Sequence, residues 1–151
     1  MKPGNPTAIS DSAIARAPSA TGQRKDTNDK KLKLTLEAGY SGGAVVLHCQ
    51  GRILYRSEAR ALAAIVAEVL PSARRMVVDL AGIDFIDSGG LGELVLTHMW
   101  AEAAGYTLRF ASPRKALRHL FEITNLVSVF DIHGSVPEAM AAMFQGEIHS
   151  A

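Results

Sequence analysis

Residues 76–95 read MVVDLAGIDFIDSGGLGELV, and this stretch decides the fold. It opens with a dense apolar run, Met76 to Leu80, which is typical of a strand buried on both faces. It closes with a helical pattern in which Leu91, Leu94 and Val95 share one apolar face. Between the two, Asp87 is followed by Ser88 and two glycines, and Asp87 is a good N-cap for the helix. A buried strand that leads directly into a helix is a building unit of α/β domains.

The residues before this stretch predict a hairpin and a helix. Leucines alternate with polar residues over 32–37, the period-2 pattern of a half-buried strand, and 44–49 form a second apolar run. The turn-forming segment 38–43 lies between them, so the pair predicts a hairpin. A helix is predicted to start at Ser57 and to end at Pro71.

The residues after it repeat the alternation of strand and helix. The predicted elements are a helix over 89–104 with Gly105 as the C′ residue just after it, a strand over 106–111, a helix with Ser112 as N-cap and Pro113 at its first position, a strand over 127–132, and a helix opened by Pro137. The full order is β-β-α-β-α-β-α-β-α. Such an order predicts parallel pairing with right-handed crossovers and one antiparallel edge from the hairpin, which is an α/β fold.

The composition limits the classes of protein that fit. The chain has 151 residues, about one domain's length, and its net charge of +1 does not suit a strongly basic nucleic-acid binder. Its one cysteine, Cys49, excludes an internal disulfide and a cysteine-cluster zinc site. The sequence contains no apolar run that could span a bilayer and no signal peptide, so we expect a soluble, cytoplasmic protein without membrane insertion.

The first 31 residues differ from the rest. They hold three of the six prolines, no aromatic residue, and six lysines and arginines against three aspartates. Such a segment cannot bury enough apolar surface to offset the entropy lost on ordering. We therefore predict a disordered basic tail over 1–31 and a single domain over 32–151.

The segment 83–92 is the most unusual loop at the end of a predicted strand, where α/β sheets place their functional sites. Two glycines in the first turn of a helix are costly, so either packing within the chain or the close approach of another molecule must compensate. Ser88 lies at this helix N-terminus, where an anion such as a phosphate is favoured. Ile86 breaks the nucleophile-elbow pattern, and the sequence contains no Walker A motif. A hydrolase that uses Ser88 therefore has no supporting motif.

The stretch resembles the signature of STAS domains, the anti-sigma factor antagonist fold. In that family a buried strand ends in Asp-Leu, as at Asp79-Leu80, and a helix starts with Asp-Ser-x-Gly-Leu-Gly, as at 87–92. Further on, Ser112-Pro113, Leu120-Phe121 and the segment from Thr124 to Phe130 resemble the family's later part. The resemblance covers about residues 32–145.

The resemblance implies a STAS-type mixed β-sheet with α-helices and a regulator rather than an enzyme, with no catalytic residue, cofactor or metal. Its partner would be an anti-sigma factor that is also a serine kinase and phosphorylates Ser88, and a serine phosphatase would reverse the modification. A phosphate beside Asp87 would disrupt an interface by repulsion and desolvation, as the physics of charge burial also indicates. The expected partner-binding residues are Asp87, Ser88, Gly89, Gly90, Leu91, Arg52 and Leu54.

One segment departs from the family pattern. Family antagonists carry an acidic residue after Gly-Glu-Leu at the end of the second strand, where this chain has Gly51-Arg52-Ile53-Leu54. The departure removes a carboxylate near Ser88 and adds the positive charge of Arg52. The alternative is therefore a non-phosphorylated STAS subunit of a membrane transporter or of a multiprotein stress-signalling scaffold. The sequence also leaves open a homodimer.

Overall fold

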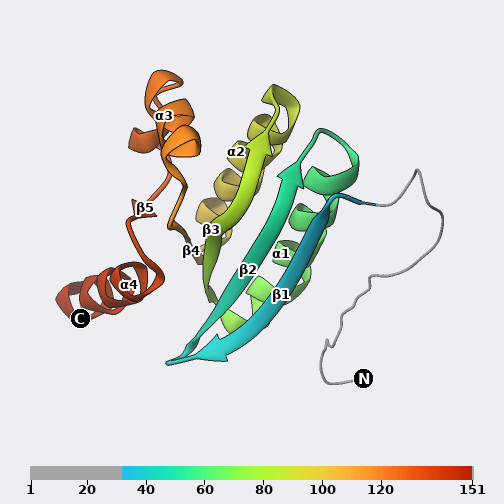
Figure 1. Ribbon diagram of the computed structural model, residues 1–151. Helices are drawn as coiled ribbons and strands as arrows, with labels where there is room; N and C mark the ends of the chain where they lie inside the picture. Colours follow the sequence, from blue (N-terminus) through green and yellow to red (C-terminus); the bar gives the residue numbers. More distant parts are fainter. Residues whose placement is uncertain (1–31, 151) are drawn as a thin grey trace.

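The computed structural model describes residues 32–150, so the predicted tail over 1–31 lies outside the described residues. The elements are β1 (Leu34–Ser41), β2 (Ala44–Ile53), α1 (Ser57–Ala73), β3 (Arg75–Ile86), α2 (Ser88–Ala104), β4 (Thr107–Ala111), α3 (Lys115–Ile123), a 3-10 turn η3 (Leu126–Ser128), β5 (Ile132–His133) and α4 (Val136–Ser150). This order confirms the predicted alternation of strands and helices (Figure 1).

The five strands form one mixed sheet in the order β1-β2-β3-β4-β5. β1 and β2 pair antiparallel, and each later strand pairs parallel with its neighbour. The hairpin turns at Gly42 and Gly43, which both have positive φ values that glycine adopts without strain. The turn is therefore shorter than the predicted segment 38–43, because β1 continues to Ser41.

The two faces of the sheet are covered unequally (Figure 1). Helices α1 and α2 pack on one face, and the main core lies there, with fully buried side chains such as Leu47, Leu62 and Phe110. Helix α4 packs against β3, β4 and β5 on the other face, through a small cluster that includes Ala139 and Met143. Among residues 32–150, no helix is both long and apolar enough to cross a membrane.

Two predicted boundaries were wrong near the decisive stretch. β3 runs to Ile86 and not only to Leu80, because the strand continues through a register shift at Gly82, where a Cβ would lie 2.6 Å from the Cys49 carbonyl oxygen. Pro71 does not end α1 but lies in its last turn, since the fixed φ of proline suits a helix and only one backbone donor is lost. The helix instead ends at Arg74, whose left-handed backbone closes a bond from its N–H to the Leu70 carbonyl.

Two further corrections fall near the C-terminus. Ser112 and Pro113 do not cap α3, because Ser112 has φ 61 and the helix begins two residues after Pro113, with Arg114 as an N-cap whose side chain makes no capping bond to the helix. The predicted strand over 127–132 is mostly a turn, in which the Leu126 carbonyl accepts the N–H groups of Val129 and Phe130. Only Ile132 and His133 pair with β4.

Candidate functional site

Asp87 joins three parts of the chain at the carboxyl end of β3. Its carboxylate accepts the N–H of Gly90 at 2.7 Å, which confirms the predicted N-cap of α2. Its two oxygens also lie 3.0 and 3.1 Å from the backbone nitrogen of Tyr55, in the connection between β2 and α1. The carboxylate therefore holds the start of α2 against the end of β2, and its role in the site is to position its neighbours.

The glycines after Ser88 are required by packing within the chain. A Cβ at Gly90 would overlap the backbone carbonyl of Ile53, and a Cβ at Gly89 would overlap the side chain of Tyr55. The close approach that the two glycines imply is therefore made within the chain, by Ile53 and Tyr55. Gly92 differs, because a Cβ there would meet no atom within 4 Å.

Ser88 is exposed at the first residue of α2. Within the described part of the chain, its hydroxyl has no hydrogen-bond partner, whereas the neighbouring Leu91 N–H bonds to the Asp87 carbonyl at 2.9 Å. The hydroxyl is therefore held on a braced helix start and is open to solvent, and the positive end of the helix dipole favours an anion there.

The other predicted site residues fall into two groups. Gly90 is buried and Leu91, in the main core, is only 8% exposed, so these two residues support the surface from the core side and contribute little area to it. Arg52 is exposed near the end of β2, and Leu54 is half-buried just after it. The backbone of β2 brings both near the start of α2, because the Asp87 N–H lies 3.3 Å from the Ile53 carbonyl oxygen.

Sequence analysis missed two aromatic residues at the corner of the domain where the ends of β2 and β3 meet the start of α2. Tyr55 and Phe85 are each about half exposed, at 52% and 50%; Tyr55 lies in the connection between β2 and α1, and Phe85 lies near the end of β3. Arg56 places its guanidinium 5.5 Å from the centre of the Tyr55 ring, in cation–π contact. In the sequence, the only indication of an exposed aromatic residue here was that Phe85 follows a charged residue near the end of a strand.

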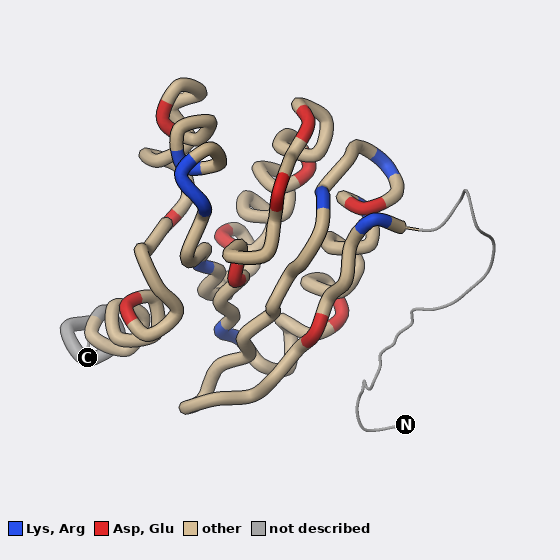
Figure 2. Tube along the Cα trace, viewed as in Figure 1, with Lys and Arg blue, Asp and Glu red and all other residues tan. Residues whose placement is uncertain are grey.

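Both positively and negatively charged residues lie around this corner. Figure 2 shows basic positions along the start of α3 beside acidic positions on β3. Among them, Arg114 forms a 2.7 Å ion pair with Asp84 and donates to the Ala81 carbonyl at 3.0 Å. These contacts hold the start of α3 against β3.

Other polar groups lie elsewhere on the sheet. His48 forms a 2.7 Å contact with Asp79 on the exposed part of the sheet. Burial raises the pKa of the Cys49 thiol, and the nearby charge of Asp79 raises it further, so this thiol is unreactive near neutral pH. Residues 32–150 hold no group of three or more histidine, cysteine or acidic side chains suited to a metal ion.

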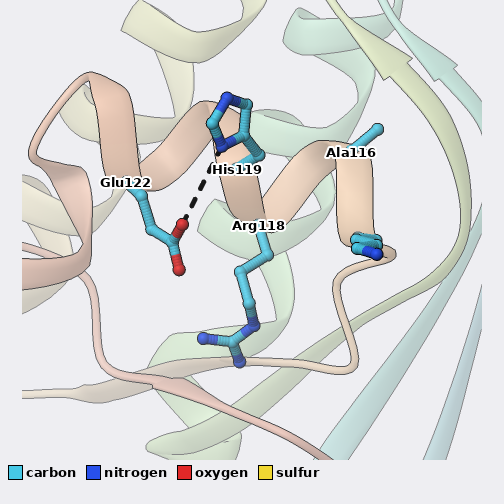
Figure 3. Close-up of a pocket in the computed structure, with 5 residues that line it drawn as sticks. Ala116, Arg118, His119 and Glu122 are labelled. Carbon is cyan, nitrogen blue, oxygen red and sulfur yellow. Dashed lines mark ion pairs between the residues drawn. The ribbon is translucent and has the colours of Figure 1, made fainter.

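A shallow groove runs along the outer side of α3 (Figure 3). It is lined by Lys115, Ala116, Arg118, His119 and Glu122, and His119 and Glu122 point toward one another with a 4.0 Å contact. All five residues come from one helix, and none belongs to the corner around Ser88.

Comparisons with known proteins find a family model and a relative that match most of the chain. The family model described as the STAS domain matches residues 35–139. A protein of Bordetella bronchiseptica that bears the provisional name anti-sigma factor antagonist BtrV is 29% identical over 114 residues, covering 76% of this chain and 96% of the relative.

Solved structures share the fold. An anti-sigma factor antagonist from Mycobacterium paratuberculosis superposes with a TM-score of 0.63 at 22% identity, covering 72% of this chain and 92% of that one. The Bacillus cell fate determinant SpoIIAA in its phosphorylated form superposes with a TM-score of 0.55 at 15% identity, covering 72% and 99%.

Proposed function

The chain belongs to the STAS domain family, and from that premise we propose that it is an anti-sigma factor antagonist that switches partners through phosphorylation of Ser88. In this proposal the unphosphorylated protein binds an anti-sigma factor that is also a serine kinase, in the cytoplasm. The kinase phosphorylates Ser88 and thereby releases the protein, and a serine phosphatase restores the hydroxyl. The protein acts as a binding module and not as an enzyme.

The position of Ser88 carries the proposal. Its hydroxyl is exposed, and the helix start that presents it is braced by the three contacts of the Asp87 carboxylate. A rigid, accessible serine meets the two needs of a switch, because a kinase must reach the oxygen and a partner must sense its modification.

The surface around Ser88 suits a partner that fits closely. Gly89 has no side chain, and the rings of Tyr55, just after β2, and Phe85, near the end of β3, supply exposed apolar area. Aromatic side chains of this kind are enriched at the centres of protein interfaces. Arg52 and Leu54 lie on the same side of the domain near the end of β2 and complete the proposed contact surface.

A phosphate at Ser88 acts on this surface through charge and volume. It carries about −1.5 to −2 charges at neutral pH. The adjacent Asp87 carboxylate carries a negative charge, and the N–H groups of Tyr55 and Gly90 stabilise that charge. Burying the phosphate in an interface therefore costs both desolvation and repulsion, whereas in the free protein water and the helix start accommodate it.

Two substitutions at Ser88 test the proposal against the anti-sigma factor kinase encoded by the same organism. Ser88→Ala removes only the hydroxyl, so binding is expected to survive within a few-fold while phosphorylation is lost. Ser88→Glu adds a carboxylate, which costs about 2–4 kcal/mol when desolvated without a partner, or roughly a 30- to 1,000-fold loss of affinity. Isothermal titration calorimetry measures both.

The matched control is Ser41→Glu, which adds the same charge at an exposed serine beside the hairpin turn, at the opposite end of the sheet. Binding by this variant should equal that of the wild type. Equal affinities of the Ser88→Ala and Ser88→Glu variants would place Ser88 outside the interface. Phosphate mapping by mass spectrometry on protein from its own host would separately contradict the proposal if Ser88 carries no phosphate while the kinase is active.

A further inference from the structure

β1 is an edge strand of eight residues, and within residues 32–150 only β2 pairs with it. The Arg52 N–H donates to the Lys33 carbonyl at 2.7 Å, so the backbone groups of the odd-numbered residues of β1 point toward β2, whereas the Lys33 N–H donates to the Glu58 carboxylate at 2.8 Å. The N–H and C=O groups of Leu34, Leu36 and Ala38 therefore point to the free edge. A row of this kind is a template for another strand.

The side chains of β1 sort into two kinds along this edge. Leu34 and Leu36 are half-buried against the main core, on the side of the sheet that α1 covers. Thr35 and Glu37 are exposed on the other side, and Lys33, in the bend just before β1, is also exposed. The charges of Lys33 and Glu37 are opposite in sign and equally distant from Thr35 along the strand.

We propose that β1 pairs antiparallel with β1 of a second copy of this chain, with the two-fold axis at Thr35. In this register Lys33 lies opposite Glu37 of the partner subunit, and Leu34 lies opposite Leu36 of the partner subunit. The outward-pointing residues Leu34 and Leu36 then meet as hydrogen-bonded pairs, which supply about four backbone hydrogen bonds within β1. The pairing extends the two sheets into one continuous sheet.

The neighbouring registers are less favourable. An axis at Glu37 places two glutamates opposite each other, and an axis at Lys33 does the same with two lysines. An axis at Leu36 leaves Lys33 opposite a glycine and Glu37 opposite a threonine. Because the backbone parity allows any of these axes, the complementary charges select Thr35.

The proposed dimer strand does not contact Ser88. Ser88 follows β3, and β2 lies between β1 and β3 in the sheet. A dimer built on β1 therefore leaves Ser88 itself exposed, and Arg52, which bonds to Lys33, lies where the two surfaces adjoin. The dimer does not depend on phosphorylation.

Cysteine cross-linking of the full chain tests the register. At the two-fold axis the two Thr35 positions form a non-hydrogen-bonded pair with Cα atoms about 4.5 Å apart, within reach of a disulfide. The Thr35→Cys variant is therefore expected to form a covalent dimer under mild oxidation. In the matched variant Glu37→Cys, the two cysteines are offset by roughly 13 Å along the strands and should not cross-link. The native Cys49 is 3% exposed and does not compete.

Charge reversal tests the same contact without oxidation. Lys33→Glu or Glu37→Lys places like charges opposite each other twice per dimer, so dimer affinity in sedimentation should fall about ten-fold or more. The double variant Lys33→Glu/Glu37→Lys exchanges the two charges and should restore the dimer. Far-ultraviolet circular dichroism verifies that each variant is folded. A wild-type chain that sediments as a monomer up to millimolar concentration would overturn the proposal, and so would equal cross-linking of the two cysteine variants.

Discussion

Helices α2 and α3 both follow a parallel strand, yet their N-termini are built in different ways. α2 starts at a side-chain cap, because Asp87 reaches the Gly90 N–H three residues ahead. α3 starts without a side-chain cap and is held by Arg114, whose guanidinium reaches across to Asp84 and Ala81 on β3. The first start depends mainly on local sequence and the second on contacts across the fold.

The largest expected effect comes from the glycine that lets β2 approach α2. Gly90→Ala places a Cβ against the Ile53 carbonyl, which is backbone and cannot turn aside, so we expect a loss of about 3 kcal/mol in the free energy of unfolding. Gly92→Ala is the matched control, since the new methyl meets nothing and alanine favours the helix by about 1 kcal/mol. Urea denaturation measures both. Equal losses would show that the clash is relieved by a small shift.

Gly92→Ala also sharpens the proposed interface. The variant should fold at least as well as the wild type, so any loss of affinity for the anti-sigma factor would place this open position in the contact surface.

The second prediction compares the two helix starts directly. Asp87→Ala removes the bond to Gly90 and both contacts to Tyr55, so it should cost about 2 kcal/mol. Ser112→Ala should change stability by less than about 0.5 kcal/mol, because Ser112 contributes no cap and its N–H bond to the His133 carbonyl is retained. Thermal denaturation of the two variants decides the comparison. A cost above 1 kcal/mol at Ser112 would mean that its hydroxyl caps α3 in solution.

The same comparison explains which parts of the fold the sequence could predict. The order of elements, the hairpin and the Asp87 cap follow from patterns within a few residues, and all three are confirmed. Ser112-Pro113 carries an equally good local cap signal. The bond from the Ser112 N–H to β5 and the positive φ of Ser112 override it.

The missed boundaries have the same origin. The continuation of β3 past Leu80 depends on a register shift against β2, in which the Asp79 carboxylate accepts the Ala81 N–H. The segment 127–132 has strand-forming residues, yet Phe130 turns inward to pack on Phe110 and Phe121. At the candidate site, the cap and the small residues were readable from the sequence. The contact between Tyr55 and Asp87, 32 residues apart, was not.

The smallest expected effect is a dependence on pH at His133 in β5, whose carbonyl accepts the N–H of Ser112 ahead of α3. Burial lowers the pKa of His133 from its usual value of 6.5, and the charge of Arg109 lowers it further, against smaller opposing effects of Asp131 and Glu138. The unfolded chain therefore binds a proton more readily than the folded one. As the pH falls below 6.5, this difference lowers stability until the folded imidazole also becomes protonated. Above 6.5 both states are neutral and the contribution vanishes.

His133→Gln removes the titrating group but keeps an oxygen that can accept from the Arg109 guanidinium, which lies 3.1 Å from the His133 Nε2. Urea midpoints at pH 7.5 and 5.5 should differ less in this variant than in the wild type. His119→Gln, at an exposed histidine on α3 itself, is the control and should retain the wild-type difference. An unchanged pH dependence in His133→Gln would mean that the imidazole gains a compensating partner when protonated, for which Asp131 is the nearest carboxylate along the chain.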